Sequence, residues 1–177
     1  MTQYIEMTPQ EMTQRVARFK DLRASKLAVI DAVIPEFERE FFSVIGRGIT
    51  EDPEMPVAIP DAQDFHVAIV KAAPGKGSGL HSHTTTEVFL PLSGRWSIQW
   101  GGKGHELMLE TWDVISVPPN VMRGFRNESS EDAYLVAIQG GTKPDPIEWS
   151  QQIREAAMKL GVTTDGKGRI VRNGNPG

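Results

Sequence analysis

Two histidines and one acidic residue stand close together near the middle of the sequence. His81 and His83 are one residue apart, and Glu87 follows four residues after the second histidine. Side chains at positions i and i+2 of a strand point to the same face, so the two histidines project together if this segment is extended. Imidazole nitrogens and a carboxylate oxygen are good ligands for a divalent first-row metal. The spacing therefore predicts a metal site at His81, His83 and Glu87.

The residues that follow the histidines predict how Glu87 would reach them. Thr84, Thr85 and Thr86 favour an extended or turning chain over a helix. Glu87 then opens an apolar run, residues 88–90, which is typical of a strand. The return of the chain along this strand would bring Glu87 beside the histidine pair. A histidine pair alone is a weak signal, because two histidines on one strand are often solvated or hydrogen-bonded.

The same segment resembles the first motif of the cupin family. That motif is a glycine, five residues, His-x-His, three or four residues, a glutamate, six residues and a second glycine, and it is filled here by Gly75, His81, His83, Glu87 and Gly94. The resemblance implies an all-β fold, a small antiparallel β-barrel of the cupin or jelly-roll type, with the ligands pointing into its lumen.

The second cupin motif is present only in part. The segment from Trp112 to Asn127 keeps its spacing but departs from it at Trp112, Asn120 and Arg123. Asparagine is the usual substitute for glycine where φ is positive, so we expect Asn120 to keep the turn. In metal-binding cupins a histidine at the position of Arg123 is the fourth ligand. A guanidinium has no free lone pair and cannot replace it.

Arg123 leaves several outcomes open. A divalent ion and a guanidinium about 5 Å apart repel by about 6–7 kcal/mol at an effective dielectric constant of 20. Arg123 either points away from a three-ligand metal, or binds the carboxylate of a ligand that lies between it and the metal, or marks a barrel without metal. A further alternative is an ion pair with Glu128 or Glu131 on the rim.

Two functions follow from these alternatives. In the first, His81, His83 and Glu87 hold a divalent metal (Fe, Mn, Ni or Zn), and Arg123 is the catalytic residue that orients the carboxylate of a small organic substrate. The resemblance alone suggests a dioxygenase-like enzyme. In the second, the barrel binds or senses a small molecule without catalysis and without a functional metal. The fold does not decide between them.

The amino-acid composition limits which classes of binding partner we expect. The chain has 177 residues, 39% of them hydrophobic and 24% charged, with a net charge of −4 and no cysteine. These values indicate a globular chain without the basic surface that nucleic acid requires. No apolar run has the length of a membrane span, and the first residues lack the pattern of a secretory signal. We expect a cytoplasmic protein, and the resemblance suggests a homodimer.

We expect three regions: an N-terminal helical extension over residues 1–37, the barrel over 38–145, and a C-terminal helix with a flexible tail over 146–177. Helices are predicted at about 9–23 and 146–160, with a loosely ordered tail over 163–177. Strands are predicted over residues 38–45, 65–73, 95–100, 105–109, 111–117 and 134–139, and a long loop over 46–64.

Four further side chains have two interpretations each. His66 either faces the lumen or forms a backbone hydrogen bond at the strand end, which is the commoner case. Trp96 and Trp100 belong either to the core or to an aromatic lumen, depending on which strand face is inward. Gln139 reaches either the cavity mouth or an edge hydrogen bond.

Overall fold

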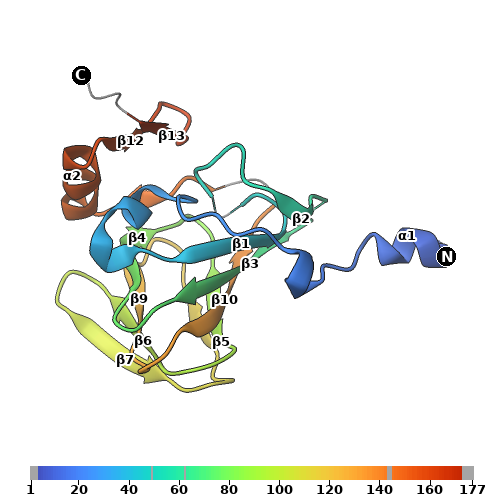
Figure 1. The fold of residues 1–177 in the computed structure, drawn as a ribbon, viewed down its shortest axis with the longest axis horizontal. Coiled ribbons are helices and arrows are strands. Elements are labelled where there is room, and N and C mark those ends of the chain that lie inside the picture. Colours follow the sequence, from blue (N-terminus) through green and yellow to red (C-terminus); the bar gives the residue numbers. More distant parts are fainter. Residues whose placement is uncertain (1–3, 49, 62, 143–144, 173–177) are drawn as a thin grey trace.

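The computed structural model describes residues 4–48, 50–61, 63–142 and 145–172. Two β-sheets face each other (Figure 1). The six-stranded sheet has the order β2-β1-β3-β10-β5-β8, from β1 (Glu40–Ile45), β2 (Val57–Ile59), β3 (Phe65–Ala72), β5 (Glu87–Pro91), β8 (Ile115–Val117) and β10 (Ala133–Gly140). The five-stranded sheet has the order β11-β4-β9-β6-β7, from β4 (Gly77–Ser82), β6 (Trp96–Trp100), β7 (His105–Leu109), β9 (Arg123–Asn127) and β11 (Glu148–Trp149).

The core lies between the two sheets. Buried and less buried residues alternate along β3 and β10, as expected for strands with one inward face. Phe89 of one sheet meets Phe125 of the other at 5.3 Å between ring centroids, and Trp96 packs on Phe125 from the side. The predicted all-β, jelly-roll-type architecture is confirmed. All paired strands among the described residues are antiparallel except β1 and β2.

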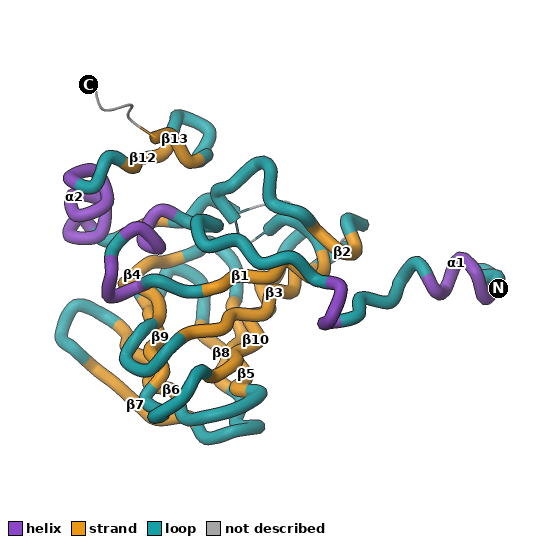
Figure 2. The backbone as a smooth tube through the Cα atoms, in the orientation of Figure 1, coloured by secondary structure: helices purple, strands orange, loops and turns teal. Residues whose placement is uncertain are grey.

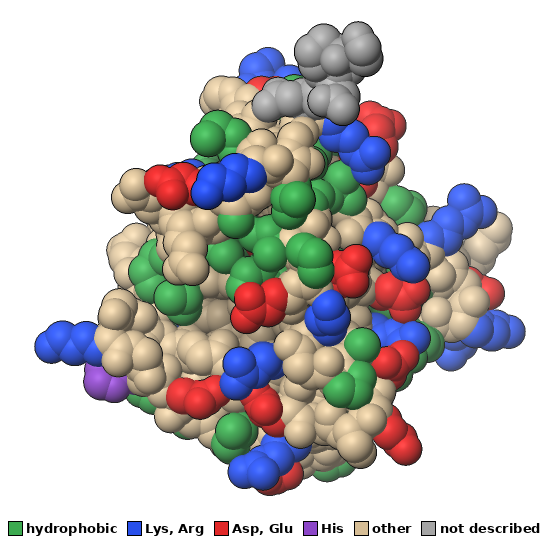
Figure 3. Space-filling model, turned by 60° about the vertical axis from the view of Figure 1, so that its left-hand side comes forward, with side chains coloured by type: hydrophobic (Ala, Val, Ile, Leu, Met, Phe, Trp, Pro, Cys, Tyr) green, Lys and Arg blue, Asp and Glu red, His purple; other side chains and the backbone are tan. Residues whose placement is uncertain are grey.

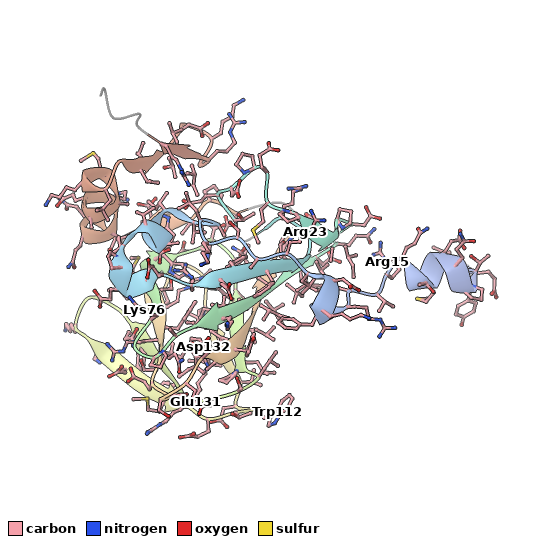
Figure 4. All side chains as sticks on the ribbon, in the orientation of Figure 1. Arg15, Arg23, Lys76, Trp112, Glu131 and Asp132 are labelled. Atoms are coloured by element: carbon pink, nitrogen blue, oxygen red, sulfur yellow. The ribbon has the colours of Figure 1, made fainter. Side chains whose placement is uncertain are left out.

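Most predicted strands agree with the observed ones to within two residues, but two regions differ. The strand predicted over 111–117 begins only at Ile115, because Thr111 and Trp112 form a turn. Trp112 has φ +75°, a backbone conformation that glycine adopts more readily, and it stands where the second cupin motif has a glycine. Its side chain lies at the periphery of the molecule (Figure 4). The predicted loop over 46–64 contains the short strand β2.

The predicted N-terminal helix over 9–23 is wrong in length. Helix α1 spans only Pro9–Thr13, and a separate 3-10 turn spans Phe19–Asp21. The capping box of Thr8 and Glu11 starts the helix as expected. No residue of α1 is buried, however, and α1 projects away from the sheets (Figure 1). Without tertiary contacts a helix this short gains little stability from further turns.

The remainder of the N-terminal region, by contrast, is packed against the sheets. It forms the 3-10 turns η2 (Ile30–Val33) and η3 (Pro35–Phe37). Asp31 and Arg39 make a buried ion pair at 2.8 Å, and the second carboxylate oxygen of Asp31 accepts a hydrogen bond from the Gly79 amide. This pair fixes the extension to the first residues of β4.

The C-terminal region holds more regular structure than expected. The predicted helix over 146–160 is shorter, because β11 comes first and α2 spans only Gln151–Lys159 after its cap Ser150. The tail predicted to be loose forms the hairpin of β12 (Val162–Thr164) and β13 (Ile170–Arg172), so that prediction is wrong for these residues. Residues 173–177 lie outside the described residues.

A second apolar cluster joins the two ends of the chain. Val29 and Ile30 of the N-terminal region pack with Trp149, with Ile153 of α2 and with Val162 of β12. In Figure 2, α2 and the β12–β13 hairpin lie at the upper left, whereas α1 lies on the opposite side, so only the later part of the N-terminal region, with η2, contacts α2 and β12. These elements therefore close one end of the barrel. The division at residues 37 and 145 stays a prediction.

Positive and negative side chains are mixed over the face shown in Figure 3. Among the described residues, no helix has the length and apolar character needed to cross a membrane.

The buried pair of Asp31 and Arg39 gives a stability prediction. Arg39→Met leaves the Asp31 carboxylate buried without its counter-charge, and we expect the free energy of unfolding to fall by about 3–5 kcal/mol. The exposed pair of Arg95 and Glu110, at 3.1 Å, supplies the control, because Arg95→Met should cost less than about 1 kcal/mol. Urea denaturation of the three proteins measures both values. Equal losses in the two variants would contradict the structural role of Asp31 and Arg39.

Candidate metal centre

The three residues predicted to bind a metal converge in the structure. His81 lies in β4, His83 follows its end, and Glu87 is the first residue of β5. One donor atom from each lies within 4.8 Å of the others. The Nε2 atoms of His81 and His83 are each 3.8 Å from Oε2 of Glu87. All three side chains are buried, so they form one inward-facing donor set, hereafter the His–His–Glu cluster.

His81 is held in the orientation that a metal ligand needs. Its Nδ1 lies 2.9 Å from the carbonyl oxygen of Gly79. Since a carbonyl can only accept, Nδ1 carries the proton and the lone pair is on Nε2, toward Glu87. Asp31 fixes the Gly79 amide on the other side of the same residue. The buried ion pair of the N-terminal region thus positions His81 through the backbone of β4.

A buried aromatic residue supports the His81 ring from outside. Trp149 pairs with His81 across the strands, and the two ring centroids are 5.1 Å apart. The indole Nε1 donates to Glu51 at 2.9 Å, and Glu51 also accepts from the Ile30 amide at 2.7 Å. Burial raises the pKa of Glu51 to about 7, against the effect of these two hydrogen bonds. Glu51 therefore links both terminal regions behind the cluster.

His83 is a buried, neutral imidazole. It is 1% exposed, and neither ring nitrogen has a hydrogen-bond partner among the described residues. Burial is the largest cause that lowers the pKa of His83, to about 4. Asp145 lies on the far side of the ring, 4.0 Å from Nδ1. A neutral, buried imidazole with an unused lone pair is chemically suited to bind a metal ion.

Glu87 is shared between the histidines and Arg123. The Arg123 Nε donates to Oε2 of Glu87 at 2.9 Å, and Nη1 donates to the Val121 carbonyl at 3.0 Å. Burial by itself would raise the pKa of Glu87, but the neighbouring His81, His83 and Arg123 outweigh it and lower the pKa to about 2. The carboxylate is therefore ionised at neutral pH.

The rim alternative for Arg123 is wrong. Its side chain is fully buried, and Glu128 pairs instead with Arg126. The predicted lumen position follows from the register, in which Arg123 of β9 lies directly opposite His81 of β4. The Arg123 Nη2 has no hydrogen-bond partner among the described residues.

The space beside the cluster is small. The cavity that contacts His81, His83 and Glu87 has a volume of about 20 Å³. Part of its wall comes from Val29 in the N-terminal region, from Arg39 just before β1, and from Ile147 and Trp149 in the C-terminal region. A cavity of this size holds one water or ion, so the body of an organic ligand would have to lie outside it.

Two of the residues with open interpretations add to the polar layer. His66 is opposite Gln139, and Gln139 is opposite Glu87, so the three side chains share one inward face. Both His66 and Gln139 are buried, which fits the lumen alternative for His66. The Gln139 amide has no hydrogen-bond partner among the described residues, so the edge hydrogen bond is not made. Trp96 is fully buried in the core, whereas Trp100 is partly exposed.

Sequence reasoning missed the residues that support the cluster, namely Asp31, Glu51, Asp145 and Trp149. Each lies at least 30 residues from the cluster or belongs to a segment expected to be loop or helix. No local spacing marks them as neighbours of His81 or His83. Only the closure of the barrel by the terminal regions brings them there.

The pKa of His83 gives a prediction for the metal-free protein. The unfolded chain binds the His83 proton near pH 6.5, whereas the folded state binds it near pH 4. Between these values the unfolded state holds more protons, so acidification from pH 6.5 to 4 destabilises the fold. Glu51 acts in the opposite direction, since its raised pKa contributes stability that is lost as the pH rises toward 7.

Urea unfolding at a series of pH values with a chelator isolates the His83 contribution. His83→Gln should lose the destabilisation between pH 6.5 and 4, while His105→Gln, at an exposed hairpin position, should keep it. The Glu51 contribution is common to all three proteins and cancels in the comparison. A difference between wild type and His83→Gln that stays constant over this range would contradict the neutral, buried imidazole.

Comparisons with known proteins agree with this architecture. No curated protein matches the chain. Solved structures that match include the polyketide cyclase RemF from Streptomyces resistomycificus, at 14% identity and TM-score 0.57 over 79% of this chain and 89% of that one. A chain from the DMSP lyases RdDddP and RnDddQII matches at 19% identity and TM-score 0.55, over 73% of this chain. The Lactobacillus farciminis oxalate decarboxylase matches at 16% identity and TM-score 0.53, over 72% of this chain.

At these low sequence identities, the structural similarity shows a shared fold and no more. The chain spans 63% of the DMSP lyase chain and 33% of the oxalate decarboxylase chain. Residues 68–139 match the protein family described as the cupin domain. That range contains the whole first motif from Gly75 to Gly94, Arg123, and β10 except for its last residue. Over these residues the chain is therefore similar to the cupin domain, and its fold agrees with that similarity.

Proposed function

We propose that this protein binds a divalent metal at His81, His83 and Glu87 and uses it to act on a small carboxylate-bearing molecule. The observation that carries the proposal is the convergence of both Nε2 atoms on one carboxylate oxygen, 3.8 Å from each, inside a cavity with room for one ion. The donor types suit Fe, Mn, Ni or Zn. Three protein ligands leave further coordination positions for a substrate, as in catalytic metal sites.

The protonation states support metal binding. The lowered pKa of His83 keeps its imidazole neutral, and the lowered pKa of Glu87 keeps its carboxylate ionised, so both are in ligand form at pH 7. A bound ion would supply a Lewis acid or an oxygen-binding centre. A dioxygenase-like reaction is one such use.

Arg123 would bind the carboxylate of the substrate. Its Nε holds Glu87, which leaves Nη2 as a buried, cationic donor without a partner. Charge-assisted hydrogen bonds from a guanidinium to a carboxylate are stronger than neutral ones, and the planar geometry favours two parallel contacts. Arg123 thus orients the substrate instead of binding the metal.

A metal-free binding or sensory protein is the second candidate. The ion pair between Arg123 and Glu87 favours it, because Oε2 of Glu87 already has a cationic partner at 2.9 Å. In this case the cluster would be a polar layer of the lumen that recognises a small molecule directly. The two candidates differ in whether the purified protein retains an ion.

Metal content separates the two functions. We expect one divalent ion per chain in the freshly purified protein and less than a tenth of that in His81→Ala and Glu87→Gln, because each variant removes one of three ligands. His105→Ala is the matched control and should keep its metal, since His105 is exposed at the hairpin tip. Elemental analysis by mass spectrometry measures the content. Wild type without metal, or with metal that neither variant loses, would leave only the second candidate.

Arg123→Gln tests the carboxylate contact. The substitution removes the charge and the unpartnered Nη2 donor, so the affinity for acetate should fall at least tenfold, while Glu87 remains available to the metal. Calorimetric titration of the metal-loaded wild type and variant measures the affinity. An acetate affinity equal to that of the wild type would exclude Arg123 as the carboxylate-binding residue. The homodimer and the cytoplasmic location stay proposals.

A further inference from the structure

A second cavity lies between the free edges of the two sheets. Strand β7 ends one sheet and β8 ends the other, and the structure shows no pairing between them among the described residues. The opening, hereafter the β7–β8 seam, has a volume of about 250 Å³. Its wall is mainly apolar and includes Ile98, Trp100, Leu107, Ile115, Val117 and Val121.

The two cavities differ in what they can hold. The space beside the His–His–Glu cluster, at about 20 Å³, admits an ion. The seam is more than ten times larger and approaches the range of small-molecule pockets, about 300–1,000 Å³. The two cavities share no lining residue, so a ligand with its body in the seam would approach the cluster only through its head group.

The strand register puts the seam next to the buried ion pair. Val117 of β8 lies directly opposite Glu87 of β5, and Trp100 of β6 lies directly opposite Arg123 of β9. Directly opposed residues have their Cβ atoms about 4.5–5.5 Å apart on the same face. The wall of the seam thus begins one strand away from both members of the pair.

The Arg123 guanidinium also contacts the seam wall. Its Nη1 donates to the carbonyl of Val121, a residue that lines the seam. Nη2, on the same guanidinium carbon, is fully buried and has no hydrogen-bond partner among the described residues. A buried cationic donor without a partner is costly unless a ligand supplies an acceptor.

We propose that the β7–β8 seam binds the apolar body of a monocarboxylate whose head group is bound by Arg123. The class that fits is a carboxylate with a single aromatic ring or a short branched chain. A second charge on the body would be desolvated against apolar walls, which disfavours dicarboxylates. The proposal rests on the carboxylate-binding role of Arg123 and adds where the remainder of the ligand lies.

Phenylacetate and acetate test the seam as a matched pair of probes, one with and one without the apolar body. We expect the wild type to bind phenylacetate at least tenfold more tightly than acetate in calorimetric titrations. Ile115→Trp fills the seam, so the phenylacetate affinity should fall at least tenfold while the acetate affinity and the metal content stay unchanged. Met108→Trp, at the half-exposed neighbour of Leu107, is the control and should bind both probes like the wild type.

If Ile115→Trp does not fold, NMR of the methyl groups in the wild type provides the test instead. Phenylacetate should shift the methyl signals of Ile98, Leu107 and Ile115, and acetate should not. Equal affinity for the two probes, or binding of phenylacetate that Ile115→Trp leaves intact, would overturn the seam proposal. A wild type that binds neither metal nor acetate would instead contradict the proposed function. Failure of the seam proposal and failure of the proposed function therefore give different results.

Discussion

The site depends on one carboxylate oxygen that several groups share. Oε2 of Glu87 accepts the hydrogen bond of Arg123 and lies 3.8 Å from both histidine Nε2 atoms. A buried carboxylate is stable only when positive or hydrogen-bonding partners surround it. Arg123 supplies that partner permanently, so Glu87 can remain ionised with or without a metal. The arginine in the second cupin motif therefore has a physical role beyond the loss of a fourth ligand.

The terminal regions determine the size of the site. Val29 and Arg39 from one end of the chain and Ile147 and Trp149 from the other contact the small cavity beside the cluster. The same regions hold His81 from behind, by way of Asp31 and the Gly79 backbone. A barrel closed at this end leaves its larger opening at the seam between β7 and β8. The closure thus separates the small cavity beside the cluster, where we propose an ion, from the seam, where we propose the body of an organic ligand.

Much of the fold and of the donor set is predictable from the sequence, because both depend on local spacing. Alternation fixes the faces of β3 and β10, and the first cupin motif brings His81, His83 and Glu87 together. Positive φ at Asn120 likewise follows from the residue type. The failures involve long-range packing. Nothing local indicates that α1 would stay short for lack of contacts, or that the tail would pair as β12 and β13.

The orientation of the Arg123 side chain also depends on long-range packing, which sequence patterns do not reveal. The family position alone suggested a lumen residue, and an exposed ion pair was an equally simple alternative. The register against His81 and the contact with Glu87 become visible only when β4, β5 and β9 are placed in space. The residues that support His81 from behind, Asp31, Glu51 and Trp149, come from segments predicted to be helix or loop. These contacts arise from the closure of the barrel and have no signature in the nearby residues.

X-ray absorption spectroscopy of the manganese- or iron-loaded protein tests the central claim most directly, because it reports the atoms bound to the ion. The account predicts a first shell of mixed nitrogen and oxygen, with the outer-shell scattering of two imidazole rings. A shell of oxygen atoms alone, without imidazole scattering, would show that the ion binds elsewhere and that the cluster does not hold it.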